Sequence, residues 1–153
     1  MLYVVQFILS FFAAAGFGIL FNAPSRTIFA GGLSGACGWL VYFAATEFGI
    51  EPVIASFFGA IVLTMLSIVS SRKLRTPIII FITCGIIPLV PGGVAYNAMR
   101  SVVLQNYDMA LAYGFQVALV SMAIAMGIIS TEMIDSLFQT LKREVKNMRK
   151  KEA

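Results

Sequence analysis

The chain has 153 residues, of which 59% are hydrophobic and 12% are charged, and its 11 basic and 7 acidic residues give a net charge of +4. A soluble domain of this length cannot cover so much apolar side chain, so the composition excludes a soluble globular protein and indicates a protein surrounded by lipid. Six of the basic residues follow position 141. The positive charge therefore belongs to a tail and does not indicate a nucleic-acid-binding face.

Five long segments without any charged residue follow one another along the chain, with 25, 20, 20, 24 and 23 residues. A bilayer core of about 30 Å needs about 20 helical residues, and backbone amides in lipid must pair within a helix. The sequence therefore predicts an all-α, polytopic integral membrane protein. We expect a transmembrane domain over residues 1–131, with five spans near residues 2–21, 27–45, 52–70, 77–103 and 109–130.

The first span is expected to remain as a permanent helix rather than a signal peptide, since no Lys or Arg precedes its apolar run. The second span is rich in small residues. Gly31 and Gly35 form a Gly-xxx-Gly pair, and Gly38 follows one turn later. Such residues let another helix backbone approach closely in lipid, so we interpret these three glycines as helix-packing residues rather than solute contacts.

The fourth span contains the string Gly85-Ile-Ile-Pro88-Leu-Val-Pro91-Gly92-Gly93. Two prolines and two adjacent glycines cannot lie in an undisturbed helix, so we expect a break at residues 88–93. Pro88 lies eleven residues after the proline at position 77, which is about 16 Å and close to the bilayer midplane. Freed carbonyls around residues 86 and 87 and freed amides of residues 93–95 would then need partners.

Transporters commonly build their sites at such breaks, because the amide end of a half-helix favours an anion and the carbonyl end favours a cation. A zwitterionic amino acid presents both charges. The candidate solute-binding residues are those of the break and the polar residues that follow it on helical spacing: Gly85, Pro88, Pro91, Gly92, Gly93, Tyr96, Asn97 and Arg100. A proline kink of purely architectural use is the alternative. For Arg100, contact with a solute carboxylate and a role as interfacial anchor both stay open.

Residues 132–153 are predicted to form a basic amphipathic tail, with apolar residues at three- and four-residue steps. The tail would lie on the anionic leaflet or against a partner; the alternative is a solvated continuation of the fifth span. If the connections alternate between the two sides, ten Lys and Arg residues fall on one side and one on the other. The positive-inside rule then places the N-terminus outside and the C-terminus in the cytoplasm.

The segment from Pro77 to Arg100, with its Pro-Leu-Val-Pro-Gly-Gly core and the following Ala-Tyr-Asn-Ala-Met-Arg, closely resembles the signature of the threonine/serine exporter family. The second span, ending in Gly-Trp-Leu-Val-Tyr (Gly38 to Tyr42), is similar to the same family. The resemblance is to the shorter, five-span component. It implies a plasma-membrane subunit that assembles with a larger five-span subunit to export threonine and serine with the proton gradient. Some split pairs of this family are associated instead with export of dicarboxylates, notably succinate.

The chain contains no histidine, and no Asp or Glu lies inside a predicted span. Proton-coupled carriers relay protons through such groups, so we expect the partner to supply the proton carrier. An enzyme is disfavoured because the sequence has no metal-ligand cluster and no nucleophile with a base, and no cofactor is expected. A non-transporting scaffold subunit stays open. Polar residues within the spans are interpreted mainly as helix-joining groups; they include Gln6, Thr64, Thr83, Gln116 and Ser121.

Overall fold

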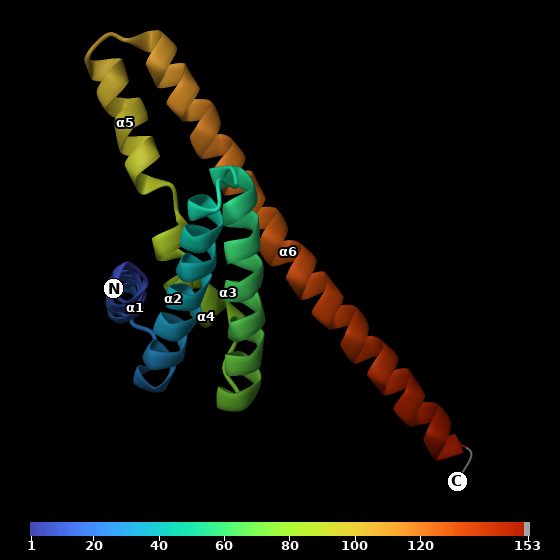
Figure 1. Ribbon diagram of the computed structural model, residues 1–153. Coiled ribbons are helices and arrows are strands. Elements are labelled where there is room, and N and C mark those ends of the chain that lie inside the picture. The colour runs from blue at the N-terminus through green and yellow to red at the C-terminus, as the bar shows by residue number, and fades with distance from the viewer. Residues whose placement is uncertain (152–153) are drawn as a thin grey trace.

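The computed structural model describes the backbone of residues 1–151 and the side chains of residues 1–142 and 144. All regular elements of this part of the chain are helical (Figure 1). In chain order they are α1 (Leu2–Leu20), α2 (Ser25–Glu47), α3 (Pro52–Leu74), α4 (Ile78–Gly85), the 3-10 helix η1 (Ile87–Leu89), α5 (Gly92–Val103) and α6 (Tyr107–Lys151). The predicted all-α class is confirmed.

Four of the described helices are long and apolar enough to cross a membrane: α1, α2, α3 and α6. The segment Ile78–Leu89 and the helix Gly92–Val103 pass the same test together and are bent by 55° at their junction. If this bent pair is counted as one span, the chain has the five spans of a polytopic membrane protein. The bent pair is the fourth of them, as the sequence predicts.

Prolines mark where three of these helices begin. Pro24 and Pro77 are the residues directly before α2 and α4, and Pro52 is the first residue of α3. A proline suits these positions because its fixed φ fits the helix and the amide it lacks would have no partner in the first turn. At the other end of α3, Arg75 adopts a left-handed φ of 51°, and the N–H of Thr76 bonds to the Ser71 carbonyl at 3.2 Å. This turn closes the helix.

Helix α2 lies at the centre of the bundle, against α1, α3 and α4. Its glycines meet these neighbours directly. A Cβ added to Gly31 would lie 3.1 Å from Cβ of Cys84, and one added to Gly38 would lie 2.9 Å from the carbonyl oxygen of Gly59. Close backbone approach of this kind is how helices gain van der Waals contact in lipid, where no hydrophobic force joins them.

The interruption in the fourth span lies slightly earlier than expected. We expected it at residues 88–93, but α-helix stops at Gly85 and α5 begins at Gly92. Pro88 explains the early stop, because it has no N–H for the carbonyl of Cys84 and its ring would clash with that carbonyl. Gly92 therefore belongs to the first turn of α5, which follows Pro91 directly.

Helices α5 and α6 form a hairpin that projects from the bundle, and α6 then runs diagonally across α3 and past its end (Figure 1). Helix α5 packs chiefly against α6, and none of its residues is buried. The crossing with α3 is tight at Gly127, where an added Cβ would lie 2.8 Å from the carbonyl oxygen of Phe57. Around it a core cluster joins α3, η1 and α6; its members are Ala60, Leu63, Leu89, Val120 and Ile124.

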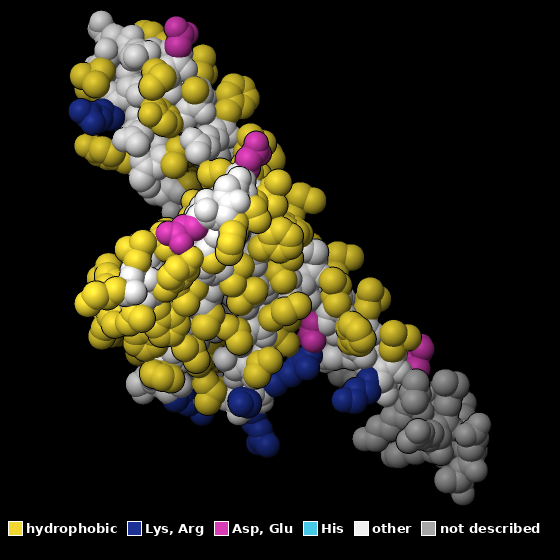
Figure 2. All heavy atoms as spheres, in the orientation of Figure 1, with side chains coloured by type: hydrophobic (Ala, Val, Ile, Leu, Met, Phe, Trp, Pro, Cys, Tyr) yellow, Lys and Arg dark blue, Asp and Glu magenta, His cyan; other side chains and the backbone are white. Residues whose placement is uncertain are grey.

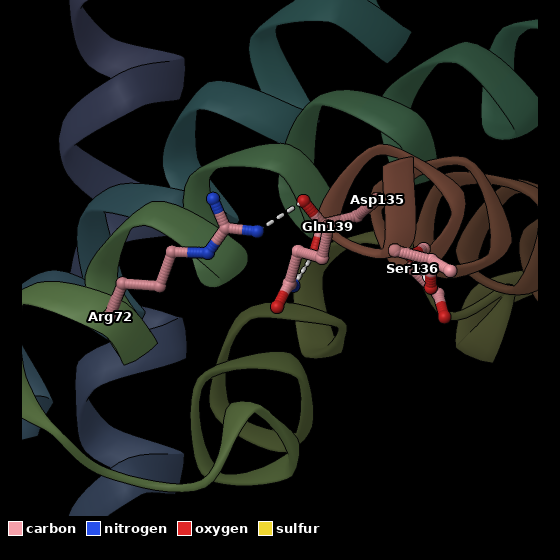
Figure 3. A network of polar contacts seen from close by, with 5 residues as sticks. Arg72, Asp135, Ser136 and Gln139 are labelled. Carbon is pink, nitrogen blue, oxygen red and sulfur yellow. Dashed lines mark hydrogen bonds and ion pairs between the residues drawn. The ribbon is translucent and has the colours of Figure 1, made fainter. Parts of the chain in front are cut away.

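The predicted tail, residues 132–153, continues α6 without a break as far as Lys151, and residues 152–153 lie outside the part of the chain that the structure describes. At the end of the bundle, Arg72 of α3 forms an ion pair with Asp135 of α6, and Nε2 of Gln139 donates to the other carboxylate oxygen at 2.8 Å (Figure 3). Beyond this point Leu137, Phe138 and Leu141 are exposed. Figure 2 shows basic side chains gathered at this end of the bundle and apolar side chains covering its middle.

Candidate functional site

A cavity of about 380 Å³ opens at the break of the fourth span. Its walls come from α2, α3, α6, the 3-10 helix η1, the first turn of α5 and the chain between η1 and α5. The residues that line it are Trp39, Tyr42, Pro52, Ser56, Pro88, Leu89, Val90, Pro91, Gly92, Gly93, Val94, Gln116 and Val120. The break itself thus supplies one wall, and three helices distant in sequence supply the others.

Hydrogen bonds around the break show which backbone groups are already paired. The Ile86 carbonyl accepts from the N–H groups of Leu89 and Val90, at 2.9 and 3.2 Å. This differs from our expectation that the carbonyl of residue 86 would be free: the 3-10 turn folds the following amides back onto it. On the far side of the break, the Gly92 N–H donates to the Val90 carbonyl at 2.7 Å.

The first turn of α5 leaves amides directed at the break. We expected the amide of residue 95 to be free as well, but the Ala95 N–H donates to the Pro91 carbonyl at 3.0 Å and closes the first helical turn. The amides of Gly93 and Val94 precede that bond, and helix geometry gives them no partner within α5. Both residues line the cavity. This wall therefore carries the positive end of a helix dipole, which favours an anionic group.

Aromatic and polar side chains of α2, α3 and α6 form the opposite walls. The Trp39 and Tyr42 rings lie with their centroids 5.1 Å apart. Trp39 Nε1 donates to Gln6 Oε1 of α1 at 2.9 Å, and Ser56 Oγ donates to the Pro52 carbonyl at 2.7 Å. Among the described residues, neither the Tyr42 hydroxyl nor the Gln116 amide has a hydrogen-bond partner in the protein.

No charged side chain lines this cavity within the described part of the chain. Recognition here must rest on backbone dipoles, neutral hydrogen-bonding groups and aromatic faces. An amide end that attracts a carboxylate and aromatic rings that attract an ammonium group are compatible with a small zwitterion.

The structure brings four of the predicted site residues together and separates the other four. Pro88, Pro91, Gly92 and Gly93 line the cavity. Gly85 is buried and packs against the backbone of Gly35 and the Leu63 side chain, so its structural contacts are those of a packing glycine.

Tyr96, Asn97 and Arg100 lie farther along α5, away from the break cavity. Asn97 and Arg100 line a second hollow of about 320 Å³ between α5 and α6, together with residues of their connection such as Asn106. The Tyr96 side chain is 67% exposed. The rise along the helix explains the separation, because only the first turn of α5 borders the break and these three residues lie in later turns.

Trp39, Tyr42, Ser56 and Gln116 were absent from the predicted site. Sequence signals for them existed but were weak. The two aromatic residues lie three apart in the second span, and Gln116 is a polar residue inside the fifth. Several other polar residues of the spans do have local partners, since Thr64 and Thr83 each bond to a carbonyl four residues earlier in their own helix. Gln6 joins α1 to α2 as expected for a helix-joining group.

Comparison with known families gives a match to the family described as "Threonine/Serine exporter, ThrE" over residues 6–134. The chain belongs to the threonine/serine exporter family. The resemblance seen in the sequence is thereby confirmed, and membership of this family makes the chain a multi-pass membrane protein of an exporter family rather than of an enzyme family.

Two relatives extend the comparison. The chain is 26% identical over 115 residues to a protein of Mycobacterium tuberculosis named "Probable threonine/serine exporter", a match that covers 74% of this chain and 22% of the relative. It is 29% identical over 112 residues to a protein of Haemophilus influenzae named "Uncharacterized protein", covering 73% of this chain and 36% of the relative. The chain thus spans well under half the length of either relative. No solved structure matches the chain.

Proposed function

We propose that the chain is the small subunit of a two-component secondary transporter that exports threonine and serine, and that the solute binds in the cavity at the break. The observation that carries the proposal is the cavity wall formed by the first turn of α5, where the Gly93 and Val94 amides lack intrahelical partners. Membership of an exporter family supports transport. The amino-acid substrate is suggested by the name of the Mycobacterium tuberculosis relative.

In the proposed complex the solute carboxylate binds at the amide end of α5. The ammonium group lies against the Trp39 and Tyr42 rings, whose faces attract cations, and against carbonyl oxygens of the lining residues Pro88 and Leu89. The Ile86 carbonyl, which we expected to be free, has no part in this arrangement because it already accepts two hydrogen bonds.

A larger subunit of the same family completes the transporter. No Asp, Glu or His lies inside the predicted spans of this chain, and proton-coupled carriers relay protons through such residues at membrane depth. We therefore assign the proton carrier to the partner. Helix α5 supports the need for a partner, because it packs chiefly on α6 and has no buried residue.

The proposed transporter lies in the plasma membrane with its N-terminus outside and its C-terminus in the cytoplasm. The basis is the positive-inside rule. Arg72, Lys73 and Arg75 lie at the end of α3 where α6 leaves the bundle, while Glu47 and Glu51 lie at the connection between α2 and α3 at the opposite end.

The test is an efflux assay in cells loaded with a threonine-containing dipeptide. Export of threonine and of succinate is followed with this chain alone, with the larger subunit alone and with both, with and without an uncoupler. We expect threonine export from the pair only, and a loss of export when the uncoupler collapses the proton gradient. Threonine export by the lone chain would contradict the assignment of the proton carrier to the partner.

A matched pair of glycine variants tests the site. Nothing lies within 4 Å of a Cβ added to Gly93 or to Gly114, but only Gly93 lines the cavity. Gly93→Val places two methyl groups where the solute binds, so we expect export to fall about tenfold or more while the complex stays assembled. Gly114→Val should leave export unchanged. Dissociation of the Gly93→Val complex would instead indicate a scaffold role. In the efflux assay of the unmodified pair, export of succinate in place of threonine would indicate a dicarboxylate carrier.

A further inference from the structure

Four side chains with a hydrogen-bonding group line the break cavity, and two of them already form hydrogen bonds within the protein. The Trp39 indole N–H donates to the Gln6 side-chain oxygen, and the Ser56 hydroxyl donates to the Pro52 carbonyl one turn earlier in α3. Tyr42 and Gln116 have no such partner among the described residues. The two free groups come from α2 and α6, so they face the same cavity from different helices.

An unpaired amide is costly at the position of Gln116. The residue lies in the apolar segment of α6 between Phe115 and Val117, four residues before the core residue Val120. A polar group in a lipid-surrounded helix without a hydrogen-bond partner costs free energy, and such residues are typically directed at a partner or a solute pathway. Gln116 is only partly buried and borders the cavity, so a molecule bound in the cavity can be the hydrogen-bond partner of its amide.

We infer that Gln116 and Tyr42 bind the side-chain hydroxyl of the solute and thereby select hydroxyl-bearing amino acids over apolar ones of the same shape. The inference rests on the proposed function and specifies the chemistry of the same site. A glutamine amide provides one acceptor and two donors, and a tyrosine hydroxyl donates and accepts, so the pair can satisfy both the hydrogen and the lone pairs of one alcohol.

Selection of threonine over valine follows because valine leaves the hydrogen-bonding groups of Gln116 and Tyr42 without a partner. Valine fills nearly the same volume as threonine but has a methyl group where threonine has its hydroxyl. A site built to hydrogen-bond a hydroxyl rejects such an analogue because its own buried polar groups then lose their partners. Alanine and serine form a second pair with the same difference.

Trp39 provides a native probe for the test. It is the single tryptophan of the chain and lines the cavity, so its fluorescence reports on binding there without a label. The full chain in lipid nanodiscs is titrated with threonine, valine, serine, alanine and succinate. The variants are Gln116→Leu, Tyr42→Phe and the control Ser121→Leu, which alters an exposed position of the same helix that does not line the cavity.

We expect the unmodified chain to bind threonine at least tenfold more tightly than valine. Gln116→Leu and Tyr42→Phe should each weaken threonine binding about fivefold to tenfold and change valine binding less than twofold, while Ser121→Leu changes neither. An unaltered threonine-to-valine ratio in both cavity variants overturns the inference, and so does equal binding of threonine and valine by the unmodified chain; the proposed function survives either result. A lack of response to all five solutes contradicts solute binding in the break cavity, on which the inference depends, whereas export by the assembled pair is tested separately by the efflux assay.

Discussion

Gly35 of α2 and Gly85 of α4 lie against each other with no room for a side chain between them. A Cβ added to Gly35 would lie 2.8 Å from the carbonyl oxygen of Gly85 and 2.9 Å from its Cα atom. The contact holds the last residue of α4 against the central helix, directly before the chain leaves α-helical geometry. The position of the break relative to the bundle therefore depends on two small residues from different helices.

Gly35→Val is expected to destabilise the fold. The added side chain would force backbone apart at the α2–α4 contact, and overpacking of this kind costs about 2 kcal/mol. Thermal unfolding of the purified chain in detergent measures the change as a lower Tm. Gly16→Val serves as the control, since nothing lies within 4 Å of a Cβ added there. Equal Tm values for the two variants would show that the close contact does not exist.

Gln6→Leu is expected to release the Trp39 ring. The hydrogen bond between Trp39 Nε1 and Gln6 Oε1 holds the indole in the cavity wall, although Gln6 itself does not line the cavity. Loss of one neutral hydrogen bond costs about 1 kcal/mol, so solute affinity should fall severalfold. Fluorescence anisotropy of Trp39 should fall at the same time. An unchanged anisotropy would mean that Gln6 does not position the ring.

The ion pair between Arg72 and Asp135 is expected to contribute little to stability. The side chains are 54% and 24% exposed, and exposed pairs are typically worth about 0.5 kcal/mol, less in high salt. A double-mutant cycle with Arg72→Ala and Asp135→Ala measures the coupling. A coupling energy above about 2 kcal/mol at high salt would indicate that the pair is shielded by a partner or by lipid.

Cysteine labelling in intact cells tests the orientation. In a background with Cys37→Ala and Cys84→Ala, we expect Asn106→Cys to react with a membrane-impermeant maleimide added outside. Lys73→Cys should react only after the cells are permeabilised, because the positive-inside rule places the end of α3 in the cytoplasm. The opposite pattern would invert the assigned topology.

The break was predictable from the sequence because its cause is local. Pro88 and Pro91 forbid continuous helix whatever surrounds them, so the proline and glycine string alone predicts an interruption. The hydrogen-bond partners of the backbone groups at the break were harder to predict from the sequence. Whether the Ile86 carbonyl stays free depends on the 3-10 turn that follows it, and proline spacing does not specify that turn.

The other cavity walls could not be predicted because they depend on packing between helices. Trp39 and Gln116 lie in separate spans, and only the crossing of α2, α3 and α6 brings them to one cavity. Gly85 looked like part of the break, yet its neighbours are in α2 and α3. Helix α6 is long because no proline or glycine follows Gly127 in the sequence. No local signal therefore ends the helix where the membrane span is expected to end.

The most direct test of the central claim is protection of a cysteine at the break by solute. Gly93→Cys is introduced into the chain without its native cysteines and co-expressed with the larger subunit, and the rate of labelling by a small maleimide is measured with increasing threonine. We predict that threonine slows labelling in a saturable way, while Asn106→Cys, outside the cavity, reacts at a constant rate. Labelling of Gly93→Cys that does not depend on threonine would contradict solute binding at the broken helix.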